Sequence, residues 1–250
     1  FYELYMNTHT GNRFLTIGTL LAILGALAVL LSGYGYQWGW WSFGFGFSVI
    51  PWGTGAAILG GIIAGIGFFR VSDRTKNQTI LGALGMSLAL IALANIGYWY
   101  LEIQKGYPPI HDITTDTQNP PEFEAIVPLR ADAPNPPQYI QEDGPAAAQE
   151  AFYSDIEPIV VSLSYNEAYD RALKAAKDMP WTLVNESRKN GKIEAYEKLA
   201  WFGFIDDVVI RVDTTETGSR IDIRSKSRIG RGDLGVNAKR IRAYTKEFKN

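Results

Sequence analysis

From Phe14 to Phe69 the chain contains no Asp, Glu, Lys or Arg. Two apolar runs lie in this stretch, at residues 14–36 and 49–69, and a third follows at 79–101. Each run has roughly 20 residues or more, which as a helix rising about 1.5 Å per residue matches the roughly 30 Å hydrocarbon core of a bilayer. The sequence therefore predicts three transmembrane helices within residues 14–101, after a short N-terminal segment at 1–13.

Basic residues beside the second connection predict the orientation. Arg70, Arg74 and Lys76 lie between the second and third runs, and Lys and Arg near span ends collect on the cytoplasmic side. With three spans, the N-terminus is then cytoplasmic and the part after Leu101 lies across the membrane. We expect a multi-pass protein of a bacterial inner membrane with a periplasmic C-terminal domain.

Aromatic residues are unusually dense between the first two runs. These residues, which we call the aromatic ledge, are Trp38, Trp40, Trp41, Phe43, Phe45, Phe47 and Trp52. One interpretation is an interfacial anchor, because Trp favours the headgroup level. The other is a contact surface for another integral membrane subunit, or for a bound lipid, quinone or pigment, since aromatic side chains dominate interface energies.

Most charged residues follow Leu101. Residues 102–158 are acidic and rich in proline, a composition that breaks helices and favours extended structure. Apolar residues such as Ile113, Phe123 and Ile126 are interspersed, so the segment is predicted to be a linker that wraps over a folded domain at residues 159–250.

Residues 159–250 show alternating strand and helix patterns. Ser164 and Glu167 form a capping-box pattern before an amphipathic helix, and Asp233 is placed as the N-cap of a second helix ending near Phe248. Strands are predicted at 159–163, 181–186, 192–197, 205–212 and 220–224. The expected fold class is a three-helix transmembrane region plus an α+β soluble domain, an antiparallel sheet with helices on one face.

Several segments of the soluble half resemble domain of unknown function 1499. They are residues 111–116 (HDITTD), 120–123 (PPEF), 193–195 (IEA), 204–212 (FIDDVVIRV) and above all 222–242 (DIRSKSRIGRGDLGVNAKRIR). The resemblance covers about residues 107–248. Members of this family often carry N-terminal membrane spans, so it implies the same organisation here. It supplies no activity and no catalytic residue.

Positive charge gathers near the C-terminal end. The predicted anion or partner contacts are Arg224, Lys226, Arg228, Arg231, Lys239 and Arg242. Three binding partners remain open: the acidic segment of the same chain, an anionic lipid headgroup or protein surface, and a small-molecule phosphate received by the glycine-containing turn and helix start. Arg224 and Arg228 are alternatively buried partners of Asp206 or Asp207.

Residue counts argue against several chemistries. The chain has no cysteine and two histidines, which excludes disulfides, thiolate zinc sites and cysteine nucleophiles. A metal cluster of His111, Asp112 and Asp116 competes with local turn bonds by these side chains, and we expect no metal. Ser225 or Ser227 with His111 lacks a nucleophile elbow, so no enzyme activity is expected. The near balance of 24 Lys+Arg against 26 Asp+Glu favours no nucleic-acid partner.

Taken with the aromatic ledge, these features predict a non-catalytic accessory or scaffolding subunit of a bacterial inner-membrane complex. Respiratory and photosynthetic complexes are natural hosts. The expected partners are membrane lipids and other integral membrane subunits. The alternative function is a periplasmic-side binding module for an anionic lipid or small molecule at the membrane surface.

Overall fold

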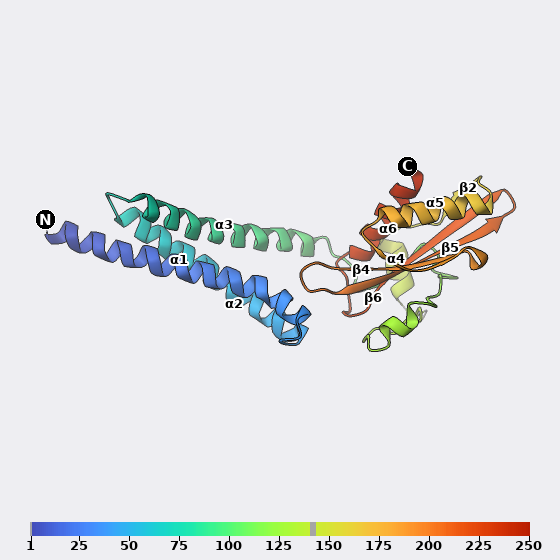
Figure 1. Cartoon of the computed structure of the whole chain (residues 1–250), viewed down its shortest axis with the longest axis horizontal. Helices are drawn as coiled ribbons and strands as arrows, with labels where there is room; N and C mark the ends of the chain where they lie inside the picture. Colours follow the sequence, from blue (N-terminus) through green and yellow to red (C-terminus); the bar gives the residue numbers. More distant parts are fainter. Residues whose placement is uncertain (1, 141–143) are drawn as a thin grey trace. The chain divides into compact units, whose positions relative to one another are not determined.

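The chain divides into two compact units in the computed structural model, which describes residues 2–140 and 144–250 (Figure 1). The helical unit contains the described residues up to Lys105 together with Trp201–Gly203. The sheet unit contains Gly106–Ala200 and Phe204–Asn250. The segment expected to be a linker is therefore part of the sheet unit from Gly106 onward.

The helical unit consists of α1 (Tyr2–Gln37), α2 (Phe43–Arg70) and α3 (Lys76–Gln104). All three helices are long and apolar enough to cross a membrane, as the charge-free runs predicted. Thr75 begins α3 with a capping box, in which its hydroxyl accepts from the Gln78 amide and the Gln78 side chain accepts from the Thr75 amide. The helices are longer than the apolar runs because flanking residues continue them at both ends.

Glycines allow α1 and α2 to pack backbone against backbone. A Cβ atom added at Gly18 would lie 2.2 Å from the Ala64 nitrogen, and one at Gly60 would lie 2.3 Å from the Ala22 nitrogen. No side chain fits at such distances, so only glycine permits this approach. The small residues of the spans thus hold the helical unit together.

The aromatic ledge is mostly helical, contrary to the expected long connection. Helix α2 begins at Phe43, six residues before the predicted run, because Ser42 is its N-cap and its hydroxyl accepts from the Phe45 amide at 3.4 Å. Phe43, Phe45, Phe47 and Trp52 therefore lie on α2. The actual connection is only Trp38–Ser42.

The sheet unit is an antiparallel sheet with helices, the predicted α+β class. Its strands are β1 (Asp112–Thr114), β2 (Ile159–Val161), β3 (Thr182–Ser187), β4 (Lys192–Lys198), β5 (Ile205–Thr215) and β6 (Gly218–Ser227). The order is β1-β6-β5-β4-β3, and β2 also pairs with β6. Its helices are α4 (Pro145–Phe152), α5 (Tyr165–Asp178) and α6 (Val236–Lys249), with short 3-10 turns η1 (Val127–Arg130) and η2 (Arg188–Asn190).

One face of the sheet carries the main hydrophobic core beneath α5 and α6 (Figure 1). Ile221 and Ile223 of β6 are fully buried there, as the alternating strand pattern predicts. Tyr244 of α6 stacks on Trp181 with ring centroids 5.6 Å apart, and its hydroxyl donates to the Ala172 carbonyl at 3.0 Å. Apolar residues of the segment predicted to be a linker, such as Ile113, complete this core.

Three local predictions for the sheet unit require correction. β1 was missed because three residues give too short a pattern, and β6 extends to Ser227 rather than ending at residue 224. α6 begins at Val236 with Gly235 as its N-cap, so Asp233 is not the N-cap residue. The Asp233 carboxylate nevertheless accepts from the amides of Gly235 at 2.9 Å and Asn237 at 2.8 Å, which is the chemistry expected of it.

Candidate functional site

The second face of the sheet is charged and covered. The residues that alternate with the core positions of β6 are Arg220, Asp222, Arg224 and Lys226, and Arg228 continues this pattern just after the strand, so they lie on the face opposite α5 and α6. Residues 116–140, which we call the strap, cover this face. The apolar cluster here is small, with Phe123 and Ile126 of the strap on Val209 of β5. Most of the contact between strap and sheet is polar.

Asp112 of β1 is the first centre of this face. Arg224 donates to it through Nε and Nη2, both at 2.8 Å, and Lys226 Nζ donates to it at 2.9 Å. The side chains of Arg224 and Lys226 are each only 1% exposed. Burial lowers the pKa of Lys226, and Asp112 opposes this effect.

Asp207 of β5 is the second centre. Arg228 donates to it at 2.7–3.1 Å, and Arg130 of the strap forms an ion pair with it at 3.1 Å. The predicted Arg228–Asp207 pairing is confirmed, whereas Arg224 pairs with Asp112. Burial raises the pKa of Asp207 and lowers that of Arg130. The sequence analysis did not predict Arg130. Its only signal in the sequence is that it is a single Arg that follows Phe123 and Ile126, the apolar residues that pack on the sheet.

The composition of the strap explains how it covers cations. Proline has no N–H, so a proline-rich backbone offers more acceptor carbonyls than donor amides. Arg224 donates to the carbonyls of Pro121 at 3.1 Å and Pro137 at 2.9 Å, and Lys226 donates to that of Gln138 at 2.8 Å. These contacts satisfy the donors of the buried cations without neutralising their charge.

A buried carboxylate fixes the other end of the strap. Glu194 of β4 is fully buried, and its oxygens accept from the backbone amides of Glu124, Ala125 and Ile126 at 2.9–3.1 Å. Three amide donors to one carboxylate form a strong, charge-assisted contact. The strap is therefore held from below by an acid and by the basic residues of β6.

Acidic residues of the 102–158 segment do pair with the basic C-terminal strand and helix. Besides Asp112, Asp116 pairs with Arg220 at 2.8 Å, and Asp155 pairs with Arg242 at 2.6 Å. This confirms the prediction that the chain's own acidic segment holds part of the basic surface.

The other predicted cations lie elsewhere. Arg231 is exposed in the turn between β6 and α6, and Lys239 is exposed on α6, where its Nζ lies 5.7 Å from the centre of the Tyr107 ring. The six predicted contact residues therefore do not form one surface. Arg224, Lys226 and Arg228 lie beneath the strap, and the others face outward.

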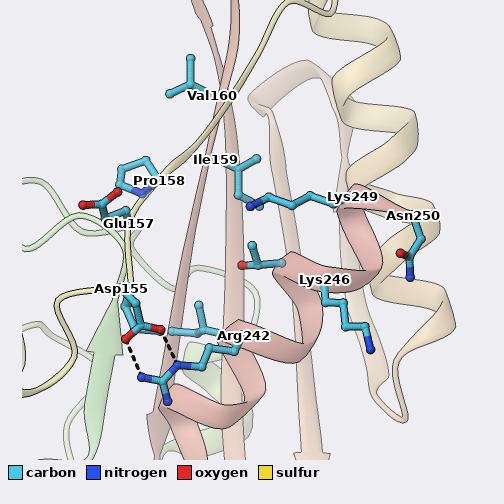
Figure 2. Close-up of a pocket in the computed structure, with 12 residues that line it drawn as sticks. Asp155, Glu157, Pro158, Ile159, Val160, Arg242, Lys246, Lys249 and Asn250 are labelled. Atoms are coloured by element: carbon cyan, nitrogen blue, oxygen red, sulfur yellow. Dashed lines mark hydrogen bonds and ion pairs between the residues drawn. The ribbon is translucent and has the colours of Figure 1, made fainter.

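A groove of about 660 Å³ lies between α6 and residues 155–160. In Figure 2, Arg242 points toward Asp155, while Lys246 points away from it. Asp155 binds Arg242 through two hydrogen bonds of 2.6 Å, so the guanidinium group of the groove is already paired. Apolar residues such as Ile159 contribute the remainder of the lining.

The sequence-predicted metal and hydrolase candidates have structural contacts. Asp112 and Asp116 accept from Arg and Lys side chains, and His111 Nδ1 lies 3.3 Å from the Arg231 carbonyl oxygen. Within the described residues, no group of three His, Asp or Glu side chains is placed to hold a metal ion.

Ser225 and Ser227 bond to a helix residue rather than to a histidine. The hydroxyl of Ser225 donates to Asn237 Oδ1 at 2.6 Å, and Asn237 Nδ2 donates to the hydroxyl of Ser227 at 2.9 Å. Arg240 joins this cluster, donating to Asn237 Oδ1 at 2.7 Å and to Asp206 at 2.8 Å. These contacts attach α6 to the sheet.

The helical unit carries an apolar groove of about 490 Å³ between α1 and α2. Its lining residues are Leu21, Leu24, Gly25, Ala28, Phe45, Ser48, Val49, Trp52, Gly53 and Ala56. Trp52 is 82% exposed and Phe45 is 53% exposed, whereas Trp41 packs on Gly35 and donates its Nε1–H to the Ser32 carbonyl at 2.9 Å. Within the aromatic ledge, Trp41 therefore packs on α1, whereas Phe45 and Trp52 are exposed along the groove.

Comparison with known proteins identifies the family and nothing more specific. Searches of curated proteins and of solved structures gave no match. The family described as "Protein of unknown function (DUF1499)" matches residues 112–248, more than half of the chain, including β1, the strap, all of β6 and nearly all of α6. The chain is therefore a member of the DUF1499 family that carries three N-terminal helices able to span a membrane.

Proposed function

We propose that this protein is a membrane-anchored accessory or scaffolding subunit that docks on another integral membrane protein through the α1–α2 groove. The observation that carries the proposal is the outward position of Phe45 and Trp52 along the apolar groove between α1 and α2. Rigid aromatic rings supply contact area at little entropic cost.

The occupant that fits is one apolar transmembrane helix of a larger inner-membrane assembly. A lipid chain is flexible and loses conformational freedom in a fixed groove, whereas a helix presents a preformed ridge. In this proposal the sheet unit lies on the periplasmic side. Its polar second face and close-packed core suit a rigid module held at the membrane surface.

Site-specific cross-linking tests the proposal. The chain has no cysteine, so Ser48→Cys places one thiol in the groove, and Ser87→Cys places a matched thiol on the exposed surface of α3. We expect Ser48→Cys to cross-link to one polypeptide in native membranes and Ser87→Cys not to. Adding Phe45→Ala and Trp52→Ala should remove this product, whereas adding Phe69→Ala, which is 76% exposed but outside the groove, should not.

Three results would contradict the docking role. They are equal cross-linking from both positions, cross-links to lipid alone, and cross-links only to a second copy of this chain. Retention of a quinone or pigment by the purified protein, lost with Trp52→Ala, would assign the groove to a cofactor instead.

A further inference from the structure

The cations beneath the strap outnumber the carboxylates that contact them. We call Arg130, Arg224, Lys226 and Arg228, with Asp112 and Asp207, the cationic cluster. Arg224 and Lys226 share Asp112, and Arg130 and Arg228 share Asp207. Among the described residues, four buried or nearly buried cations therefore contact two carboxylates.

The two halves of the cluster adjoin one another across Phe123. The guanidinium carbon of Arg224 lies 4.8 Å from the centre of the Phe123 ring, and that of Arg130 lies 5.5 Å from it. Arg224 and Arg130 each lower the pKa of Lys226, as like charges at short range do. The excess positive charge is thus concentrated rather than spread along the strand.

Donors of the cluster also lack acceptors. The Arg130 side chain is fully buried, and its Nε makes no hydrogen bond with the described residues, while its Nη1 lies 3.1 Å from Asp207 Oδ2. The buried Tyr139 hydroxyl, next in sequence to Gln138, likewise has no hydrogen-bond partner among them. Unsatisfied buried donors cost free energy, and buried net charge costs more, so the cluster favours an additional anionic acceptor.

We propose that the cationic cluster binds one phosphate-class oxyanion, which is held by Arg224, Lys226 and Arg130 in place of the strap carbonyls of Pro137 and Gln138. Two guanidinium groups and an ammonium group, two of them from β6 and one from η1, match an acceptor with several oxygens and two charges. A charged acceptor also neutralises the buried positive charge, which a neutral carbonyl does not do. This inference is independent of the docking role of the helical unit.

Displacement of those two carbonyls gives a direct readout at Tyr139. The full chain in detergent is titrated with inorganic phosphate at constant ionic strength set by chloride, and uptake is measured by calorimetry. We expect saturable uptake of one phosphate per chain, together with several-fold faster chymotrypsin cleavage after Tyr139. Absence of saturable uptake at millimolar phosphate would overturn the proposal, and so would uptake that leaves the cleavage rate unchanged.

Paired variants locate the bound phosphate. Lys226→Met should weaken phosphate binding at least about tenfold, whereas Lys249→Met, on the exposed end of α6, should leave it unchanged. Lys226→Met should also keep or raise the melting temperature in phosphate-free buffer, because it removes an excess buried cation. Equal weakening of binding by both variants, or a loss of folding with Lys226→Met comparable to that of Asp112→Asn, would show a balanced cluster and reject the site.

Two further arms test rival sources of the anion. The variant Glu142→Gln/Asp143→Asn should bind phosphate as the native chain does. Phosphate uptake that occurs only in this variant would mean that the chain's own carboxylates fill the site, and would overturn the proposal.

In nanodiscs, loss of phosphate uptake when phosphatidic acid replaces phosphatidylcholine would identify a lipid headgroup as the source, and unchanged uptake would identify free phosphate. Either source supports the oxyanion site.

Discussion

Arg224 and Asp112 form a forked ion pair beneath the strap, with Nε to Oδ1 and Nη2 to Oδ2 both at 2.8 Å. The pair joins β6 to the first strand of the sheet unit, and the two residues are 112 positions apart in sequence. Lys226 binds the same carboxylate. Asp112 is therefore shared by two buried cations, and it is the only described acid that contacts them.

Removing this carboxylate charge should destabilise the sheet unit strongly. We expect Asp112→Asn to cost about 3–5 kcal/mol, since it leaves two cations buried without their counter-ion. The matched control is Asp155→Asn, whose partner Arg242 is 42% exposed, and it should cost at most about 1 kcal/mol. Denaturant melts followed by tryptophan fluorescence measure both values. Similar losses in the free energy of unfolding for the two variants would contradict the claim that burial makes the Asp112 ion pairs more important than an exposed one.

The phenol of Tyr139 should have a pKa well above that of a surface tyrosine. Burial raises the pKa of its phenol to about 12, and the charge of Asp112 adds to this effect. The folded state therefore keeps a proton that the unfolded chain loses near pH 10, so this group contributes stability below about pH 10 that is lost as the pH rises through about 12.

Absorbance titration of the phenolate checks this value. Tyr139→Phe should remove one high-pH transition from the spectrum, and Asp112→Asn should shift it to lower pH. Tyr153, whose pKa burial also raises to about 12, should keep its transition in the Tyr139→Phe variant. A Tyr139 transition near pH 10 would show that water reaches the hydroxyl.

Close packing of α1 and α2 predicts opposite effects for two glycines of the same helix. Gly60→Ala would place a Cβ atom 2.3 Å from the Ala22 nitrogen, so the helices must separate, at a cost of about 1–3 kcal/mol. Gly55→Ala meets nothing within 4 Å and should be neutral or stabilising by up to about 1 kcal/mol, because alanine has the higher helix propensity. Thermal unfolding in detergent, followed by circular dichroism, separates the two. A neutral Gly60→Ala would refute the backbone contact.

The distribution of basic residues predicts the orientation in the membrane. Single cysteines at Lys189, exposed in η2, and at Asp73, exposed between α2 and α3, provide matched probes. A membrane-impermeant maleimide should label Lys189→Cys in intact spheroplasts and label Asp73→Cys only after lysis. The reverse pattern would place the sheet unit in the cytoplasm and move the proposed docking to that side.

The sequence by itself determined the elements whose signals are local or periodic. The charge-free stretch from Phe14 to Phe69 predicts membrane helices because a bilayer requires an apolar segment of fixed length. The Ser164–Glu167 capping box and the alternation of Ile221 and Ile223 likewise predict a helix start and a buried strand face. These signals depend on neighbours a few residues apart, so no tertiary contact is needed to read them.

Only the tertiary structure decided which charges meet. The same alternation that places Ile223 in the core places Arg224 on the opposite face, but nothing near Arg224 in sequence reveals that the strap covers that face. Without the partner Asp112, 112 residues away, a run of Arg and Lys on one strand is typical of a solvated basic surface. Burial and pairing depend on chain segments brought together by folding, and so the sequence located the basic residues while the structure determined that Arg224 and Lys226 are buried and Arg242 is exposed.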